Sequence, residues 1–405
     1  MTKEQEGALS GYRVLDIADS NGAYCTKLLA DLGADVIKIE RPEGDPGRGI
    51  PPFAGDTPHP EKSLHFLHRN ANKRGVTLKL DTVEGSNILK RLVKTADVLV
   101  DNSPPDYMAG LGLDYSVLSE INPGLIMASI TEFGHSGPYK DRKGSNLVDF
   151  AMSGIMITSG YPGKEPCLLP GSPAYDSASV HASVSIVAAI YMRGTTGQGQ
   201  YIDTSVHVTS RTGLYPWIIP NYSYALNPGG PPPTSENRMG AQIYPVYPCK
   251  DGFIRIIALT PRQWDALMRV LDNPDVLQTE EWRSFMYRIG NADDLYALML
   301  EFTIKYTMRE LFEAGRREGV PIAPILSIAD FYNSPQTKAR EYFVEVDHPV
   351  AGKADYPGPP YKWTETPVTM RRPAPCIGEH NEEVYCQELG LSTDNLAALR
   401  GGGIV

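Results

Sequence analysis

The first hundred residues alternate between short apolar runs rich in β-branched side chains and stretches with helical periodicity. Such runs are typical of β-strands, and the segments between them are long enough to form helices. The strand candidates are residues 13–17, 35–39, 76–80, 98–100 and, further on, 126–130, with a helix over 83–95. Strands separated by helices form parallel sheets that helices cover on both faces. The sequence therefore predicts an α/β fold with a doubly wound parallel sheet.

A break in composition divides the rest of the chain. Residues 177–192 are apolar and rich in small side chains, which predicts a buried helix, and a strand is expected over 200–206. Residues 227–240 hold four prolines and three glycines, which is typical of a linker. We expect a large domain (1–220), a linker (221–240), a small domain (241–328), a second linker (329–360) and a C-terminal part (361–405).

Composition limits the classes of partner. The chain has 38 Lys and Arg residues against 48 Asp and Glu residues, and its formal net charge is −10. This balance, with no basic run, argues against nucleic acid or an anionic membrane as the main partner. No apolar stretch approaches the roughly 20 residues of a membrane span, and the polar start is unlike a signal peptide. The five cysteines are scattered, which predicts reduced thiols, no metal site and a cytoplasmic protein.

Basic residues gather near the end of the second predicted strand and the start of the third: Lys38, Arg41, Arg48, Lys73 and Arg74. At one edge of a parallel sheet these charges could hold a phosphorylated ligand, and each alone could equally be a solvated surface charge. The loop 18–23 after the first predicted strand has a single glycine, so the G-x-G-x-x-G fingerprint of dinucleotide binding is absent.

Asp176 stands among small residues directly before the long apolar helix. A carboxylate at this place caps the helix by accepting hydrogen bonds from its free backbone N–H groups. The residues alone favour this structural role over a chemical one and leave both open.

Segments in order along nearly the whole chain resemble class III CoA-transferases, the CaiB/BaiF family. They are residues 28–48, 72–80, 96–102, 134–142, 188–203, 319–343 and 374–392. The resemblance implies a Rossmann-like large domain completed by the C-terminal segment, a smaller α+β domain, and two chains interlocked like links. It also implies transfer of CoA from an acyl-CoA to a carboxylic acid, with the CoA thioester as substrate, no tightly bound cofactor and no metal.

The resemblance also implies roles for individual residues. In the family an aspartate attacks the donor thioester, which gives a mixed anhydride and then an aspartyl-CoA thioester. The family pattern carries CoA contacts over to Arg41, Asn72, Lys73 and Asn102.

A tyrosine occupies the position of the family's aspartate. That aspartate stands thirteen residues before the first alanine of an L-A-A-L segment; here the alanine is Ala188, and counting back gives Tyr175, not Asp176. A shift of one residue turns a side chain by about 100° on a helix, so we expect Asp176 to point away from the thioester. Tyr175 is a poor acyl acceptor at neutral pH, because the pKa of a phenol is near 10.

Three loops expected near CoA differ from the family as well. The loop 18–24 is one residue short, and Asn102-Ser103-Pro104-Pro105 lacks the aromatic residue of an N-F-x-P segment. Gly110 replaces an arginine expected near the diphosphate, and the loss of a charge-assisted contact weakens phosphate binding.

We therefore expect the chain to be the non-catalytic partner in a heterodimeric or heterotetrameric class III CoA-transferase, beside a homologous subunit that carries the catalytic aspartate. The two-subunit members that it resembles favour succinyl-CoA as donor and benzylsuccinate as acceptor, with malate as a second candidate. One alternative is a self-sufficient homodimer that uses Asp176 through a local bulge or an altered helix start. Another is a protein that binds CoA esters without catalysis.

Overall fold

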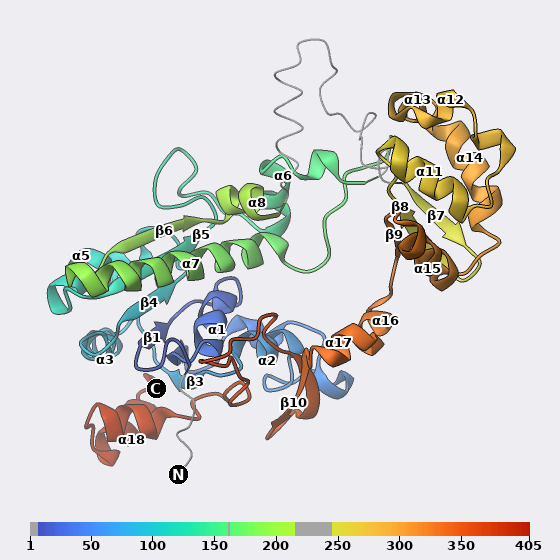
Figure 1. The fold of residues 1–405 in the computed structure, drawn as a ribbon. Coiled ribbons are helices and arrows are strands. Elements are labelled where there is room, and N and C mark those ends of the chain that lie inside the picture. The colour runs from blue at the N-terminus through green and yellow to red at the C-terminus, as the bar shows by residue number, and fades with distance from the viewer. Residues whose placement is uncertain (1–6, 161–162, 215–244) are drawn as a thin grey trace. The chain divides into compact units, whose positions relative to one another are not determined.

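The larger part of the chain is built on a six-stranded sheet (Figure 1). The computed structural model describes residues 7–160, 163–214 and 245–405, so the predicted linker 221–240 lies outside the described residues. The strand order is β3-β2-β1-β4-β5-β6, and all neighbouring strands are parallel. The strands are β1 (Arg13–Asp16), β2 (Asp35–Glu40), β3 (Arg74–Thr77), β4 (Val98–Asp101), β5 (Ile126–Thr131) and β6 (Tyr201–Ser205). The predicted doubly wound parallel sheet is confirmed.

Helices cover both faces of this sheet. They are α1 (Ala23–Asp31), α2 (Leu64–Asn70), α3 (Val83–Val93), α4 (Tyr107–Gly110), α5 (Tyr115–Ile121), α6 (Asn146–Met152), α7 (Pro173–Thr196) and α8 (Val206–Leu214). Successive side chains of a strand point to opposite faces. Val14 and Val98 accordingly belong to a buried cluster with α1 and α7, whereas their neighbours Leu15 and Leu99 belong to a second cluster with α3.

Helix α7 begins earlier than the sequence predicts. Pro173 is its first residue, a position that suits proline because the first helical N–H has no partner inside the helix. It ends at Thr196 and is capped by Gly197, whose φ of 72° is left-handed. Tyr175 and Asp176 therefore lie in the first turn of a 24-residue helix.

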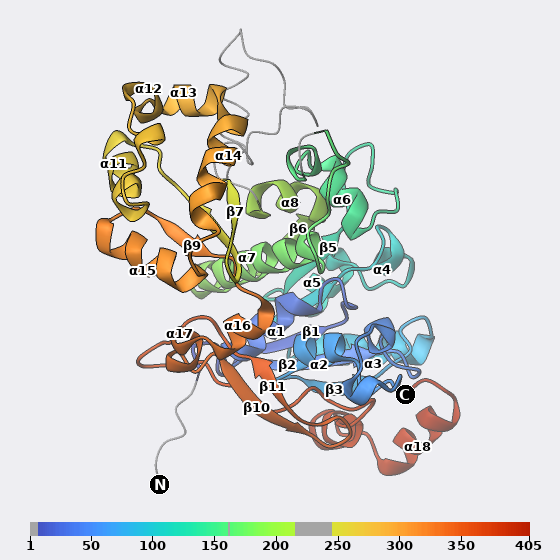
Figure 2. The ribbon, with the colours of Figure 1, turned by 90° about the vertical axis from the view of Figure 1, so that its right-hand side faces the viewer.

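The C-terminal segment returns to the large sheet. It contains the π-helical η5 (Glu383–Glu388) and α18 (Thr393–Gly401), and Val384 and Leu396 pack into the cluster that also holds α3. The hydroxyl of Tyr385, which is fully buried, donates a 2.8 Å hydrogen bond to the carbonyl of Thr77 at the end of β3. In Figures 1 and 2 this segment lies beside α3 and β3, far away in sequence.

Backbone contacts divide the chain into two units. The first takes in the described residues of Met1–Ser153, Leu169–Ile218 and Gln336–Val405, and the second those of Gly154–Leu168 and Ile219–Pro335. The second has an antiparallel sheet of β7 (Val246–Cys249), β8 (Gly252–Ile256) and β9 (Ile322–Pro324). Its helices are α11 (Pro261–Val270), α12 (Glu280–Arg283), α13 (Phe285–Gly290), α14 (Ala292–Thr303), α15 (Met308–Glu318) and α16 (Ile328–Asn333).

Residues 329–360, expected as a linker, include regular structure. Helix α17 (Pro335–Ala339) is followed by an antiparallel hairpin of β10 (Phe343–His348) and β11 (Gly352–Pro357). Within the described ranges the chain also forms the 3-10 helices η1 (Pro46–Gly49), η2 (Ala54–Asp56), η3 (Met156–Thr158) and η4 (Asp275–Leu277). No helix in the described part of the chain combines the length and apolar character needed to cross a membrane.

Candidate functional site

A cavity of about 510 Å³ lies at the carboxyl ends of β1, β4 and β5. The sheet order reverses between β1 and β4, and the loops that diverge at such a point leave a crevice in which parallel sheets bind ligands. The lining residues come from 19–21, 102–105, 130–132 and 140–144, with Tyr175 and Val206. This cavity is the candidate site, and we call it the switch-point cavity.

Tyr175 forms part of the wall of the switch-point cavity. It is 7% exposed, and its hydroxyl donates a 2.8 Å hydrogen bond to Oε1 of Glu132, the residue after β5. Burial, and next the negative charge of Glu132, raise the pKa of Tyr175 far above 10. The phenol therefore stays protonated at neutral pH and cannot act as a nucleophile there.

Asp176 points to a different part of the unit. Its Oδ1 lies 2.6 Å from Nη2 of Arg69 on α2, and its side chain is 40% exposed. Asp176 does not line the switch-point cavity. Adjacent residues on α7 thus reach different surroundings, as the step of about 100° per helical residue requires.

Sequence reasoning missed two acids beside Tyr175. Glu132 lines the cavity, and Asp149 on α6 is fully buried. Burial first, and then the hydrogen bond and charge of Glu132, raise the pKa of Asp149 to about 9. Two signals could have revealed them, because Glu132 follows an apolar strand at its carboxyl end and Asp149 interrupts the apolar side of a short helix.

Lys73, expected to contact CoA, instead makes hydrogen bonds to buried groups of the protein itself. Its buried ammonium group donates to Asp16 Oδ2 at 2.8 Å, to the carbonyl of Ala23 at 2.9 Å and to Asn70 Oδ1 at 2.8 Å. Burial lowers its pKa to about 8. All three N–H groups are occupied, so in this structure Lys73 orders the loop after β1 and offers no hydrogen to a ligand.

The side chain of Asn72 likewise makes its hydrogen bonds to other residues of the protein. Its amide nitrogen donates to Asp31 at 2.8 Å and to the carbonyl of Thr369 at 2.9 Å, and its oxygen accepts the N–H groups of Arg371 and Arg372. These bonds fasten the returning C-terminal segment to the large unit.

Asn102 and Arg41 do face cavities. Asn102 lines the switch-point cavity and accepts a 3.0 Å hydrogen bond from the N–H of Asp19, which orders the loop after β1. Arg41 is exposed at the end of β2 and lines a separate, open cavity of about 610 Å³. Arg41 makes no ion pair within the described ranges, so its charge is available for a phosphate.

The other basic residues near β2 and β3 form ion pairs with acidic side chains. Lys38 lies 2.7 Å from Asp45, and Arg48 lies 2.7 Å from Glu40 and 2.5 Å from Glu61. Arg74 is held by Asp35, Glu383 and Glu388. Most of the expected cluster therefore stabilises the fold, and Arg41 remains as the phosphate candidate.

A second cavity of about 300 Å³ is also lined by Pro104. The rings of Tyr115 and Tyr201, 5.9 Å apart, form part of its wall. They offer aromatic surface near the segment that carries Ser103, where the family resemblance leads us to expect an aromatic residue.

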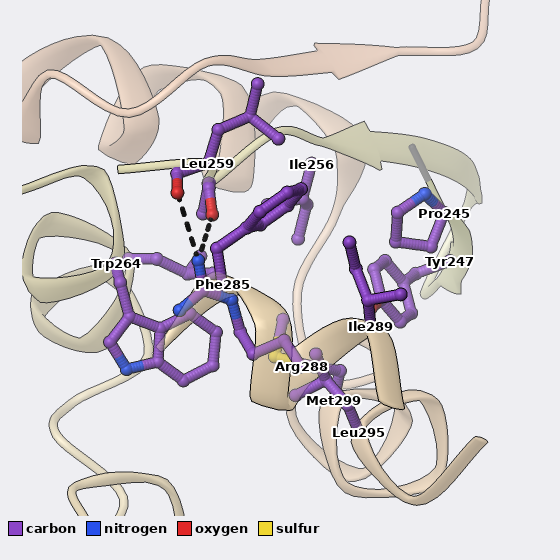
Figure 3. Close-up of a pocket in the computed structure, with 12 residues that line it drawn as sticks. Pro245, Tyr247, Ile256, Leu259, Trp264, Phe285, Arg288, Ile289, Leu295 and Met299 are labelled. Atoms are coloured by element: carbon purple, nitrogen blue, oxygen red, sulfur yellow. Dashed lines mark hydrogen bonds between the residues drawn. The ribbon is translucent and has the colours of Figure 1, made fainter. Parts of the chain in front are cut away.

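A small cavity of about 40 Å³ lies inside the second unit (Figure 3). Arg288 lines it and is 6% exposed, and its terminal N–H groups donate to the carbonyls of Ala258, Leu259, Trp282 and Arg283. Its guanidinium also lies 4.5 Å from the centroid of the Trp264 ring. Arg288 thus ties the end of β8 to α12, which is a structural role.

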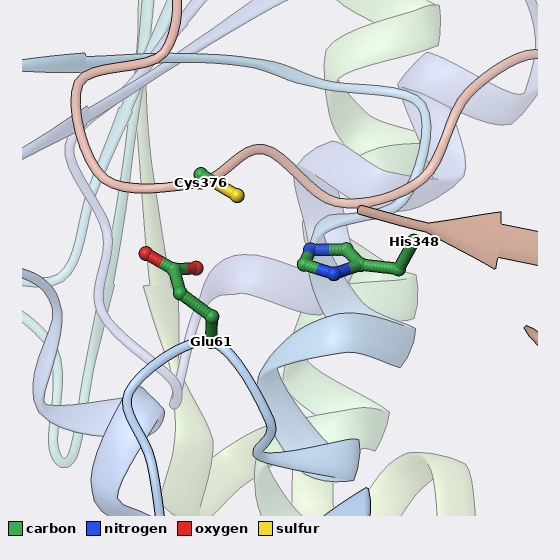
Figure 4. A group of neighbouring side chains, drawn as sticks. All are labelled: Glu61, His348 and Cys376. Atoms are coloured by element: carbon green, nitrogen blue, oxygen red, sulfur yellow. The ribbon is translucent and has the colours of Figure 1, made fainter. Parts of the chain in front are cut away.

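Glu61, His348 and Cys376 come together near the returning segment (Figure 4), with ligand atoms within 4.8 Å of one another. Nδ1 of His348 accepts hydrogen bonds from the N–H groups of Val350 and Ala351, which places the ring proton on Nε2. Burial raises the pKa of Cys376 to about 11, and Glu61 already neutralises Arg48. A protonated Nε2 and a neutral thiol are poor metal ligands, so this donor set does not suit a metal.

Comparison with known proteins gives a consistent result. Residues 9–381 match the model of CoA-transferase family III. The chain is 31% identical to succinyl-CoA:(R)-benzylsuccinate CoA-transferase subunit BbsE of Thauera aromatica, over 98% of each chain. It is 33% identical to a formyl-CoA:oxalate CoA-transferase of Streptomyces avermitilis, over 98% of this chain and 99% of that one. The crystal structure of a CAIB/BAIF family protein from Brucella suis superposes with a TM-score of 0.83 at 30% identity, over 95% of this chain and all of that one.

Proposed function

The chain belongs to the class III CoA-transferases, and we propose that it is the non-catalytic subunit of a heteromeric enzyme of this family. A homologous subunit supplies the aspartate that attacks the acyl-CoA. This chain supplies a matching large unit and completes the assembly. The substrate is a CoA thioester, no tightly bound cofactor takes part, and the enzyme works in the cytoplasm.

One observation carries the proposal. At the first turn of α7, Tyr175 faces the switch-point cavity while the carboxylate of Asp176 is paired with Arg69 at 2.6 Å. A carboxylate nucleophile must reach the thioester carbonyl at about 3–3.5 Å. To do so, Asp176 would have to leave Arg69, which is 8% exposed and would then keep a buried charge without its partner.

An exposed apolar stripe on α7 supports an assembly. Val180, Val184, Val187 and Tyr191 are 43%, 64%, 38% and 79% exposed. Their spacing of four, three and four residues is the pattern by which one helix packs along another. Such a stripe supports burial against a partner chain, and we propose an interlocked heterodimer, or a heterotetramer, built from the two homologous subunits.

The CoA donor and the acceptor acid are inferred from similarity to a relative whose substrates are named. The relative from Thauera aromatica is named as a subunit of a succinyl-CoA:(R)-benzylsuccinate enzyme. We propose succinyl-CoA as the donor and benzylsuccinate as the acceptor for the assembly that contains this chain.

A second candidate is a self-sufficient homodimer that uses Asp176. The half-exposed carboxylate and the formyl-CoA:oxalate relative, which is not named as a subunit, favour it. It requires a rearrangement of the first turn of α7 that breaks the pair with Arg69.

The test is reconstitution. The chain is purified alone and after co-expression with a homologue that carries an aspartate thirteen residues before the corresponding alanine, and CoA transfer from succinyl-CoA to benzylsuccinate is measured. The proposal predicts activity only for the co-expressed pair, which stays active when Asp176→Asn is introduced here and loses activity when the partner's aspartate is replaced. Full activity of the chain alone, abolished by Asp176→Asn, would establish the homodimer instead.

A further inference from the structure

The cavity beside α4 and α5 has walls of a different kind from those of the switch-point cavity. Its volume is about 300 Å³, which is at the lower end of the roughly 300–1,000 Å³ that small-molecule sites occupy. Tyr115, Met127, His135 and Tyr201 are among the residues that line it, and we call it the aromatic cavity. The rings of Tyr115 and Tyr201 lie 5.9 Å apart, and the ring of His135 meets that of Tyr201 edge to face at 5.8 Å. Such a wall of rings, with a flexible thioether beside it, suits an aromatic ligand.

The two cavities draw on opposite faces of β5. Met127 and Ser129 line the aromatic cavity, and Met127 packs into the cluster that holds α3. Ile130 lines the switch-point cavity and packs into the cluster that holds α1 and α7. Pro104 is the one described residue that lines both cavities. A molecule in the aromatic cavity therefore occupies a place of its own.

Two buried polar groups line the aromatic cavity and can bind a ligand. Nε2 of His135 is buried and has no hydrogen-bond partner among the described residues. A buried polar atom without a partner costs free energy unless a bound group completes its hydrogen bonds. Asp101 is 1% exposed, and its two oxygens accept one hydrogen bond each, from the hydroxyl of Ser129 at 2.6 Å and from the N–H of Ser103 at 3.0 Å. Burial raises the pKa of Asp101, and a carboxyl group can accept a further hydrogen bond in either protonation state.

The charged groups of the aromatic cavity disfavour an anion. In the described part of the chain no Lys or Arg lines it, whereas Asp101, Asp106 and Asp114 do. Lys140 neutralises Asp106 from outside the cavity, at 3.1 Å. Asp114 makes no ion pair with any described residue, so its negative charge acts on whatever enters. A negatively charged molecule would meet this charge with no cation to offset it.

We propose that the aromatic cavity is a binding site for a small aromatic molecule that carries an N–H group and no negative charge. The ring packs against Tyr115 and Tyr201, and the polar group completes the hydrogen bonds of Asp101 and of Nε2 of His135. The inference goes beyond the proposed function, because this site is separate from the place of the thioester and does not depend on which subunit carries the catalytic aspartate.

The test compares three probes that share a benzene ring: benzamide, which has an N–H group and no charge, benzoate, which is an anion of the same shape, and toluene, which has no polar group. Their dissociation constants for the full chain are measured by titration at pH 7.5. We expect benzamide to bind about tenfold more tightly than benzoate and than toluene. Saturating CoA should leave benzamide binding unchanged, because the phosphates of CoA are anions and the two cavities are separate.

Variants place the probe in the aromatic cavity. Tyr115→Leu removes one wall and should weaken benzamide binding about fivefold. The matched control is Tyr107→Leu, because Tyr107 is a 39% exposed tyrosine of α4 that does not line the cavity, and it should keep the wild-type affinity.

A second variant tests the hydrogen bond and keeps the test open if Tyr115→Leu does not fold. His135→Phe retains a ring against Tyr201 and removes Nε2. It should weaken benzamide binding about fivefold and leave toluene binding unchanged.

Four results would overturn the inference: equal affinities for benzamide and benzoate, benzamide binding that His135→Phe leaves unchanged, displacement of benzamide by CoA, or no binding of benzamide. None of them bears on the reconstitution test. An active co-expressed pair that fails to bind benzamide would defeat this inference alone, and an inactive pair that binds benzamide as expected would defeat the proposed function alone.

Discussion

The hydroxyl of Tyr175 lies 2.8 Å from Oε1 of Glu132, at the position that the family resemblance leads us to expect for a catalytic aspartate. This bond holds the first turn of α7 against the end of β5. It also leaves Asp176, the next residue, on the side of Arg69. The arrangement explains how a chain can keep the fold of the family while its own carboxylate is turned away from the cavity.

Tyr175→Phe should destabilise the chain by about 2 kcal/mol, because Glu132 then keeps a buried carboxylate oxygen without its donor. Denaturant unfolding measures this difference. Tyr191→Phe is the matched control on the same helix: Tyr191 is 79% exposed, so the change should be below about 0.5 kcal/mol. Equal effects of the two substitutions would contradict the role assigned to the bond.

The free energy of unfolding should fall as the pH rises from about 5 to 9. The pKa of Asp149 is raised to about 9, so across this range the folded chain holds a proton that the unfolded chain has released. Asp149→Asn should therefore be more stable than the wild type by on the order of 1 kcal/mol at pH 8 and should lose this advantage near pH 4. Thermal unfolding of both proteins between pH 4 and pH 9 checks the sign. An advantage that grows towards low pH would contradict it.

Lys73 and Arg41 should respond differently to replacement. Lys73→Met leaves Asp16 buried without its partner and should cost about 3–5 kcal/mol of stability. Arg41→Ala removes an exposed charge and should change stability by less than about 0.5 kcal/mol. If Arg41 contacts a phosphate, the same substitution should weaken CoA binding about tenfold.

Lys94→Ala serves as the control for Arg41, since Lys94 is an exposed cation at the end of α3. It should leave CoA binding unchanged in equilibrium titrations. Equal losses in Arg41→Ala and Lys94→Ala would indicate a non-specific effect of charge.

Asn72→Ala should loosen the C-terminal segment. The substitution removes the hydrogen bonds to Thr369, Arg371 and Arg372, and it also places alanine at a φ of 69°, which is left-handed. We expect a loss of about 2–4 kcal/mol and faster proteolysis after residue 360. Asn395→Ala, at an exposed position of α18, should do neither.

Much of the fold follows from local pattern. The strands β1, β2, β4 and β5 end within one residue of the predicted runs, because each run is apolar on both sides and buried between helices. β3 begins at Arg74, two residues before the predicted start at Val76. The backbone of Arg74 pairs with β2, and its buried side chain is neutralised by ion pairs with Asp35 and Glu388. A search for apolar runs cannot reveal a strand residue of this kind, because its side chain is charged.

The site was less accessible to sequence reasoning. Counting along α7 separates Tyr175 from Asp176, because helical geometry turns adjacent residues by a known angle. The partners of these residues, Glu132 and Arg69, come from segments far away in sequence, and nothing local indicates that they meet. The same holds for Lys73, which directly precedes β3 and whose charge is matched by Asp16 at the end of β1, two strands away in the sheet.

The most direct measurement traps the covalent intermediate. The co-expressed pair is incubated with succinyl-CoA and quenched with hydroxylamine, which converts an aspartyl-CoA thioester or a mixed anhydride into an aspartyl hydroxamate, and each subunit is analysed by peptide mass spectrometry. The account predicts a hydroxamate on the aspartate of the partner subunit and an unmodified Asp176 in this chain. A hydroxamate on Asp176 would contradict the central claim that this carboxylate is turned away from the reaction.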